Sequence, residues 1–126
     1  MTSKVRGVEK RDYKKGTFVF KEGDVGECAF LISEGEVEIL KTIDQREVVL
    51  GIVKNAGMFG EMALISNKPR MAAARVRKDA KLMIITPKLF EGRLEKLDPF
   101  SRALIEVLSN HIRSISSKLD AEIRAS

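Results

Sequence analysis

The chain has 126 residues, of which 44% are hydrophobic and 33% are charged, and its formal net charge at pH 7 is +5. This size and composition exclude an intrinsically disordered protein and predict a single folded domain over residues 1–126. One cysteine, Cys28, and one histidine, His111, exclude an internal disulfide and the usual cysteine and histidine zinc sites.

The distribution of charged and apolar residues indicates where the protein acts. The 23 lysines and arginines are scattered among 18 acidic residues rather than clustered, so we expect no nucleic acid partner. No apolar run approaches the roughly 18 residues that a membrane-spanning helix needs. Residues 2–15 are polar and lack the apolar centre of a signal peptide. These features predict a cytoplasmic protein without direct membrane contact.

Most of the chain has the composition of short strands. Residues 1–11 show no clear periodicity and are interpreted as a tail or one short helical turn. The segments with strand composition are Thr17–Phe20, Cys28–Ser33, Glu36–Lys41, Glu47–Val53, Ala72–Arg77 and Lys81–Ile85. The turns expected between them lie at residues 21–26, Glu34–Gly35, Asp44–Gln45 and Lys78–Asp79. Short strands separated by such turns predict an antiparallel sandwich or barrel over about residues 13–85.

The periodicity becomes helical after Ile85. Thr86–Pro87 and Asp98–Pro99 each combine an N-cap side chain with a proline at the first helical position, which predicts helices over about residues 87–97 and 99–123. The second helix carries an apolar stripe of Phe100, Leu104, Val107, Leu108, Ile112, Ile115, Leu119 and Ile123. The start of this stripe is expected to pack on the barrel. Its later part extends further than a small barrel needs, which favours a partner helix or a lid over a ligand.

The most concentrated site chemistry lies between Phe59 and Val76. Gly60 can adopt a positive φ and allows a ligand to approach the backbone closely. Glu61–Ile65 are helix formers that predict one short helical turn, whose first N–H groups favour an anion. Arg70 can hold two phosphate oxygens at once with its guanidinium group. The stretch therefore has the chemistry of a small anion-binding site.

Glu61 needs a separate explanation, because a carboxylate beside a phosphate is repulsive. An ionised carboxylate only accepts hydrogen bonds, so a hydroxyl next to the phosphate would give it a partner. A cyclic phosphodiester with a ribose 2′-OH meets both demands, with one negative charge for Arg70 and one donor for Glu61.

The segments Phe59-Gly60-Glu61-Met62-Ala63-Leu64 and Pro69-Arg70, with Ala72 after them, resemble the phosphate-binding cassette of the cyclic nucleotide-binding domain family. The resemblance covers roughly Tyr13 to the C-terminus. It implies a mainly β fold, namely an antiparallel, jelly-roll-like β-roll with a short cassette helix and two C-terminal α-helices. It also implies a regulatory domain that senses a cyclic mononucleotide.

The resemblance also assigns roles to individual residues. Backbone N–H groups of Gly60, Met62 and Ala63 would face the phosphate, and Arg70 would pair with it. Glu61 would accept from the ribose 2′-OH. The backbone of Met71 would complete the phosphate shell, and Ala72 would leave room for it. In the family, a threonine at the position of Met71 is associated with cGMP, and methionine cannot donate a hydrogen bond to guanine, so cAMP is favoured over cGMP.

Other classes of function have less support. No nucleotide-triphosphate loop, nucleophile elbow or dinucleotide fingerprint occurs, so we expect neither an enzyme nor a bound cofactor. In the family, transcription factors add a helix-turn-helix after the long helix; since this sequence ends at Ser126, we expect no DNA-binding domain unless the chain is an excised fragment. A degenerate domain remains an alternative. In it, Glu61 and Arg70 form only an internal salt bridge, and the long helix binds a second copy or an effector protein.

Overall fold

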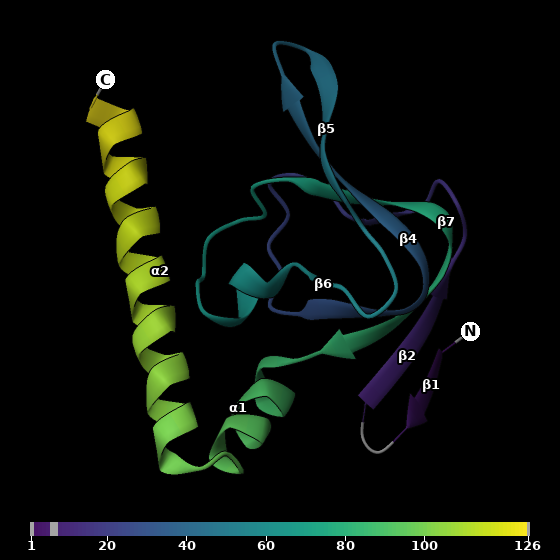
Figure 1. Cartoon of the computed structure of the whole chain (residues 1–126). Coiled ribbons are helices and arrows are strands. Elements are labelled where there is room, and N and C mark those ends of the chain that lie inside the picture. Colours follow the sequence, from purple (N-terminus) through teal and green to yellow (C-terminus); the bar gives the residue numbers. More distant parts are fainter. Residues whose placement is uncertain (1, 6–7, 126) are drawn as a thin grey trace. The chain divides into compact units, whose positions relative to one another are not determined.

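The computed structural model describes the backbone of residues 2–5 and 8–125 and the side chains of residues 8–115, 117 and 118. Contacts divide the chain into two units, residues 1–89 and residues 90–126. The elements are β1 (Thr2–Val5), β2 (Val8–Tyr13), β3 (Phe18–Phe20), β4 (Ala29–Ile43), β5 (Arg46–Val53), β6 (Met58–Phe59), the 3₁₀ turn η1 (Glu61–Leu64), β7 (Ala73–Ile85), α1 (Pro87–Glu95) and α2 (Pro99–Ala125) (Figure 1). The predicted class, mainly β with two helices at the C-terminal end, is confirmed.

The first unit is organised around two long antiparallel strands, β4 and β7. The strand order is β1-β2-β7-β4-β5, with β3 paired to β7 and β6 paired to β4, and every pairing is antiparallel. β4 and β7 pair from Ala29 with Ile85 at one end to Leu40 with Ala73 at the other. The expected antiparallel β-roll is therefore present, and β4 and β5 form a hairpin that projects from it (Figure 1).

The predicted turns at Glu34–Gly35 and Lys78–Asp79 are wrong, because β4 and β7 run through both positions. The pairing register shifts around Glu34 and Glu36, so this glycine lies in an irregularity of a continuous strand. Gly35 has a φ of 99°, and a Cβ there would lie 2.4 Å from the Asp79 carbonyl oxygen. Glycine and charged residues occur at bulges as well as at turns, and local sequence does not distinguish the two.

The interpretation of residues 1–11 as a tail or helical turn is also wrong, since β1 and most of β2 lie there. The β-roll therefore begins before the predicted residue 13. β2 pairs with β7 from Glu9 opposite Ile84 to Tyr13 opposite Ala80, and Val8 is buried. Consecutive charged residues hide the two-residue period of this strand, and only the partner strand fixes its conformation.

The predicted turn between β4 and β5 and the predicted starts of both helices agree with the structure. Asp44 and Gln45 form the β4–β5 turn with φ values of 51° and 66°. Thr86 Oγ1 accepts a hydrogen bond from the Leu89 N–H at 3.1 Å, and Asp98 Oδ2 accepts one from the Ser101 N–H at 2.9 Å, which confirms both helix starts.

Some predictions about the helices and domain organisation differ from the structure or stay open. α1 ends at Glu95, two residues before the predicted end. The side chains of Leu119 and Ile123 lie outside the described residues, and a single domain stays a prediction. Within the described part of the chain, no helix is both long and apolar enough to cross a bilayer.

Three phenylalanines bring the separate strands of the roll together near the end of β6. Phe30 and Phe59 stack with ring centroids 5.3 Å apart, and Phe20 lies 6.0 Å from Phe30 and 6.1 Å from Phe59. Phe30 and Phe59 belong to the buried core together with Ile32, Val37, Ala74, Val76, Ala80, Leu82 and Ile84. Aromatic pairs at these separations stabilise the folded state by more than their buried area alone would give. The cluster therefore holds in place the residues that pack on it.

The bulge at Gly35 leads to a prediction about stability. Gly35→Ala places a Cβ against the Asp79 and Ala80 backbone at a φ of 99°, and we expect it to destabilise the fold by about 2–5 kcal/mol. Gly16→Ala is the matched control, because Gly16 has a φ of 89° but no described atom within 4 Å of the new Cβ. It should cost only about 1–2 kcal/mol. Urea unfolding measures both, and equal losses would contradict steric crowding at Gly35.

Candidate functional site

The site lies where the Gly60 turn meets the side chain of Arg70. Gly60 has a φ of 71° and precedes η1, which confirms both the positive φ and the short helical turn expected from the sequence. A Cβ at Gly60 would lie 2.9 Å from Arg70 Nη1 and 3.2 Å from Cε2 of Phe20. Glycine is therefore required here both for the backbone conformation and for the close approach of a guanidinium group.

The Arg70 guanidinium is held by two backbone carbonyls and an aromatic ring. Nη1 donates to the Gly60 carbonyl at 3.1 Å, and Nη2 donates to the Cys28 carbonyl at 2.7 Å. The carbon of the guanidinium lies 4.1 Å from the centroid of the Phe20 ring, within the range of a cation–π contact. The Nε–H is buried and has no hydrogen-bond partner in the described part of the chain.

The loop between β3 and β4 fixes the backbone of Arg70. The Arg70 N–H donates to the Asp24 carbonyl at 2.8 Å, and the Gly23 N–H donates to the Arg70 carbonyl at 2.8 Å. The loop is braced in turn, since the Lys21 N–H donates to Asp24 Oδ2 at 2.9 Å. A Cβ at Gly26 would lie 2.8 Å from Arg70 Nη2, so this loop also closes around the side chain.

Burial shapes the electrostatics of the site. Desolvation lowers the pKa of Arg70, because the charged guanidinium loses water on burial. A bound anion would stabilise the charged form and oppose this shift. Burial also raises the pKa of the Cys28 thiol, which keeps it neutral.

The residues chosen from the sequence gather around this turn. The turn begins at Gly60 and continues through Glu61, Met62 and Ala63. Arg70 contacts the Gly60 carbonyl from ten residues further along the chain. The Ala63 N–H donates to the Gly60 carbonyl at 3.2 Å, so in this structure it is engaged within the turn. Ala72 is half-buried, whereas Met71 is 58% exposed.

Glu61 does not form the internal salt bridge that a degenerate domain would need. Its side chain is exposed, and no ion pair joins it to Arg70 among the described residues. Arg70 instead makes its polar side-chain contacts with carbonyl oxygens. The Glu61 carboxylate is thus available to accept a hydrogen bond from outside the chain.

Sequence reasoning missed several residues that build the site. Phe20, Asp24, Gly26 and Cys28 contact Arg70 but were interpreted only as strand or turn residues. The two glycines in the turn at residues 21–26 were the available signal. Because Asp24 and Cys28 act through backbone atoms, their side-chain types carry little information about the contact.

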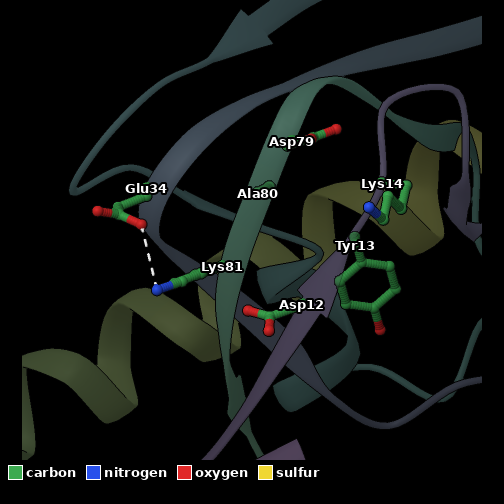
Figure 2. Close-up of a pocket in the computed structure, with 7 residues that line it drawn as sticks. All are labelled: Asp12, Tyr13, Lys14, Glu34, Asp79, Ala80 and Lys81. Carbon is green, nitrogen blue, oxygen red and sulfur yellow. Dashed lines mark ion pairs between the residues drawn. The ribbon is translucent and has the colours of Figure 1, made fainter. Parts of the chain in front are cut away.

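A separate open pocket of about 440 Å³ lies between β2, β4 and β7. It is lined by Asp12, Tyr13, Lys14, Glu34, Asp79, Ala80 and Lys81 (Figure 2). Three of its charged groups have partners: Lys81 pairs with Glu34 at 3.6 Å, and Asp79 accepts from the Lys15 N–H at 2.7 Å. The described residues contain no cluster of histidine, cysteine, aspartate or glutamate suited to a metal ion.

Comparison with known proteins places the chain in a family. The family model described as the cyclic nucleotide-binding domain matches residues 10–96. Because the match spans well over half of the chain, the chain belongs to the cyclic nucleotide-binding domain family. This is a family of regulatory domains, not of catalytic ones.

Two curated relatives show the range of proteins that carry such a domain. The chain is 32% identical over 112 residues to the anaerobic regulatory protein of Bacillus subtilis, covering 87% of this chain and 47% of that protein. It is 39% identical over 82 residues to a cAMP-dependent protein kinase regulatory subunit of Mycosarcoma maydis, covering 63% of this chain and 16% of the subunit. The chain thus spans less than half the length of either relative.

Among solved structures, the chain is similar to the EAL enzyme Bd1971. The half-site-occupied form matches with a TM-score of 0.82 and 36% identity, covering 86% of this chain and 98% of that one. The cAMP-bound and cGMP-bound forms match with TM-scores of 0.68 and 0.69 at 36% and 38% identity. They cover 91% and 88% of this chain and 31% and 30% of theirs.

Proposed function

We propose that the site binds a cyclic mononucleotide and that Arg70 pairs with its phosphate. The observation that carries this proposal is the Arg70 guanidinium, fixed beside the Gly60 turn with a buried Nε–H that finds no acceptor among the described residues. A buried donor without a partner costs free energy, and a phosphate oxygen would supply both an acceptor and a counter-charge. The guanidinium has five N–H donors, so its contacts with two carbonyls leave donors for a ligand.

The rest of the cassette would complete recognition of the ligand. The backbone N–H groups of Gly60, Met62 and Ala63 would face the phosphate, with the Ala63 N–H leaving the Gly60 carbonyl on binding. The backbone of Met71 would close the phosphate shell, and Ala72 is small enough to leave room for it. Glu61, exposed and unpaired among the described residues, would accept from the ribose 2′-OH.

We further propose that cAMP binds more tightly than cGMP. The Bd1971 forms with cAMP and with cGMP match this chain about equally well, so similarity alone does not separate the two ligands. The argument for cAMP depends on Met71, which directly follows Arg70 and is 58% exposed. Its thioether cannot donate a hydrogen bond to the guanine base, so cGMP gains nothing from this position.

The phosphate contact leads to a prediction about affinity. Arg70→Ala should weaken cAMP binding by roughly 2–5 kcal/mol, which is about 30-fold to several thousand-fold, because it removes the charge that faces the phosphate. Isothermal titration with cAMP and cGMP measures the loss. Wild-type protein that gives no heat and no NMR shift change at millimolar ligand would refute nucleotide binding.

Matched variants separate this contact from charge and from folding. Arg77→Ala removes the same charge from β7 at an exposed ion pair with Glu36 and should leave the affinity nearly unchanged. Since Arg70 also bridges two carbonyls, Arg70→Ala could lose stability. Gly26→Ala is the second variant, because it crowds the guanidinium while keeping the charge. Full affinity in both Arg70→Ala and Gly26→Ala would place the phosphate elsewhere.

A second prediction isolates the ribose contact. Glu61→Ala should weaken cAMP but leave the 2′-deoxy analogue almost unaffected, because only cAMP offers the 2′-OH donor. The loss should correspond to one hydrogen bond to a charged group, roughly 1.5–3 kcal/mol. Competition titrations of both nucleotides on both proteins give the comparison. Equal losses for the two ligands would rule out this role.

For regulation, we propose that nucleotide binding shifts the population of arrangements of α2. A ligand shifts such an equilibrium only if it binds one arrangement more tightly than the other. Described apolar residues recur along α2 and are exposed: Phe100, Leu104, Val107, Leu108, Ile112 and Ile115. A helix with such a stripe would respond to a change in what covers it.

An alternative function is protein–protein interaction without a nucleotide response. The observation that favours it is the projecting β4–β5 hairpin (Figure 1), which exposes Ile43, Val48, Val49, Leu50 and Ile52. Exposed apolar residues gathered on one element are typical of an interaction surface. The hairpin and α2 would then bind a second copy or an effector protein.

One experiment distinguishes regulation from a constitutive interaction. We expect saturating cAMP to shift the NMR amide signals of α2 and to change any self-association seen by sedimentation. These changes should be absent in Arg70→Ala at the same nucleotide concentration. Unchanged α2 signals would refute the switch, and a dimer that ignores nucleotide would support the interaction module.

A further inference from the structure

A lysine on β4 contacts the backbone that follows Arg70. Lys41 Nζ donates a hydrogen bond to the Met71 carbonyl at 2.7 Å and lies 3.3 Å from Glu22 Oε2. The second oxygen of this carboxylate, Oε1, accepts from the Thr42 N–H at 3.2 Å. These contacts join three segments, namely the loop after β3, the β4–β5 hairpin and the end of the cassette.

Together with the loop after β3, Lys41 fixes two successive peptide groups. The Gly23 N–H holds the Arg70 carbonyl at 2.8 Å, and Lys41 Nζ holds the Met71 carbonyl at 2.7 Å. In a planar trans peptide, the N–H points away from the carbonyl oxygen of the same group. Each contact therefore also sets the direction of an N–H, that of Met71 in the first peptide and that of Ala72 in the second.

The ion pair itself contributes little to stability. The side chains of Lys41 and Glu22 are 37% and 38% exposed, and pairs with this exposure contribute little to folding. The Thr42 N–H, and then Lys41, hold the pKa of Glu22 below its ordinary value, so this carboxylate stays charged at neutral pH. Lys41 thus contributes little to the free energy of folding through its ion pair, yet it donates a hydrogen bond to the Met71 carbonyl of the site. This combination indicates that Lys41 positions the backbone of the site.

We propose that Lys41, oriented by Glu22, is a positioning residue of the nucleotide site that sets the Met71–Ala72 peptide beside the phosphate. This inference depends on the proposed function, because it concerns the affinity of the same site. Lys41 acts through the backbone and does not itself bind the ribose. Its loss should therefore weaken ligands with and without the 2′-OH to the same extent.

The test compares Lys41→Met with two matched variants. Lys41→Met keeps an apolar stem of similar length without the charged donor, and we expect it to weaken cAMP and 2′-deoxy-cAMP equally, by about five- to tenfold. Lys41→Arg keeps a charged donor and should bind within about twofold of wild type. Lys81→Met is the charge control, because it breaks the exposed pair with Glu34 without touching the cassette, and it should also remain within about twofold.

A measurement without ligand separates this inference from the proposed function. In nucleotide-free protein, Lys41→Met should shift the NMR signals of the Met71 carbonyl carbon and the Ala72 amide, while Lys81→Met leaves them in place. Wild-type protein that binds neither cAMP nor cGMP would overturn the proposed function. If wild type binds, unchanged affinity in Lys41→Met, or unchanged Met71 and Ala72 signals, would overturn the positioning role alone.

Discussion

The partial burial of one positive charge, the Arg70 guanidinium, connects the parts of the chain that form the site. A guanidinium partly removed from water needs acceptors, and Arg70 finds them in the carbonyls of Gly60 and Cys28, with the Phe20 ring beneath it. Its backbone is tied to Gly23 and Asp24 at the same time. One side chain and its own peptide groups thus hold together the Gly60 turn, the start of β4 and the loop after β3.

This arrangement depends on how the β-roll brings distant segments together. β6 pairs with β4 through Phe59 opposite Phe30, which brings Gly60 close to Cys28, and β3 pairs with β7 through Phe20 opposite Ala74, which brings Phe20 close to the segment that carries Arg70. The bulge at Gly35 accommodates the shifts in pairing register, so both strands continue past this position instead of ending in turns. The aromatic cluster of Phe20, Phe30 and Phe59 then gives the guanidinium an apolar base.

The success of sequence reasoning differed from residue to residue for physical reasons. The helix starts at Thr86 and Asp98 depend on contacts with residues only three positions away, so local sequence predicts them well. Gly60 and Arg70 could be singled out because Phe59-Gly60-Glu61 and Pro69-Arg70 occur together in one short stretch and in combination resemble the phosphate-binding cassette. Cys28, Asp24 and Lys41 could not, because they contribute through backbone oxygens or reach a backbone carbonyl from far along the chain.

By itself, the sequence determined the class of fold, the cassette with Gly60 and Arg70, and the two helix starts, because these features follow from local conformation and from side-chain chemistry within a short stretch. Only the tertiary structure decided that residues 8–13 are a strand, that Gly35 lies in a bulge, and that Arg70 contacts carbonyls instead of Glu61. Each of these outcomes depends on a partner far away in sequence. Pairing across a sheet and the partial burial of a charge are decided by which distant groups the fold brings within reach.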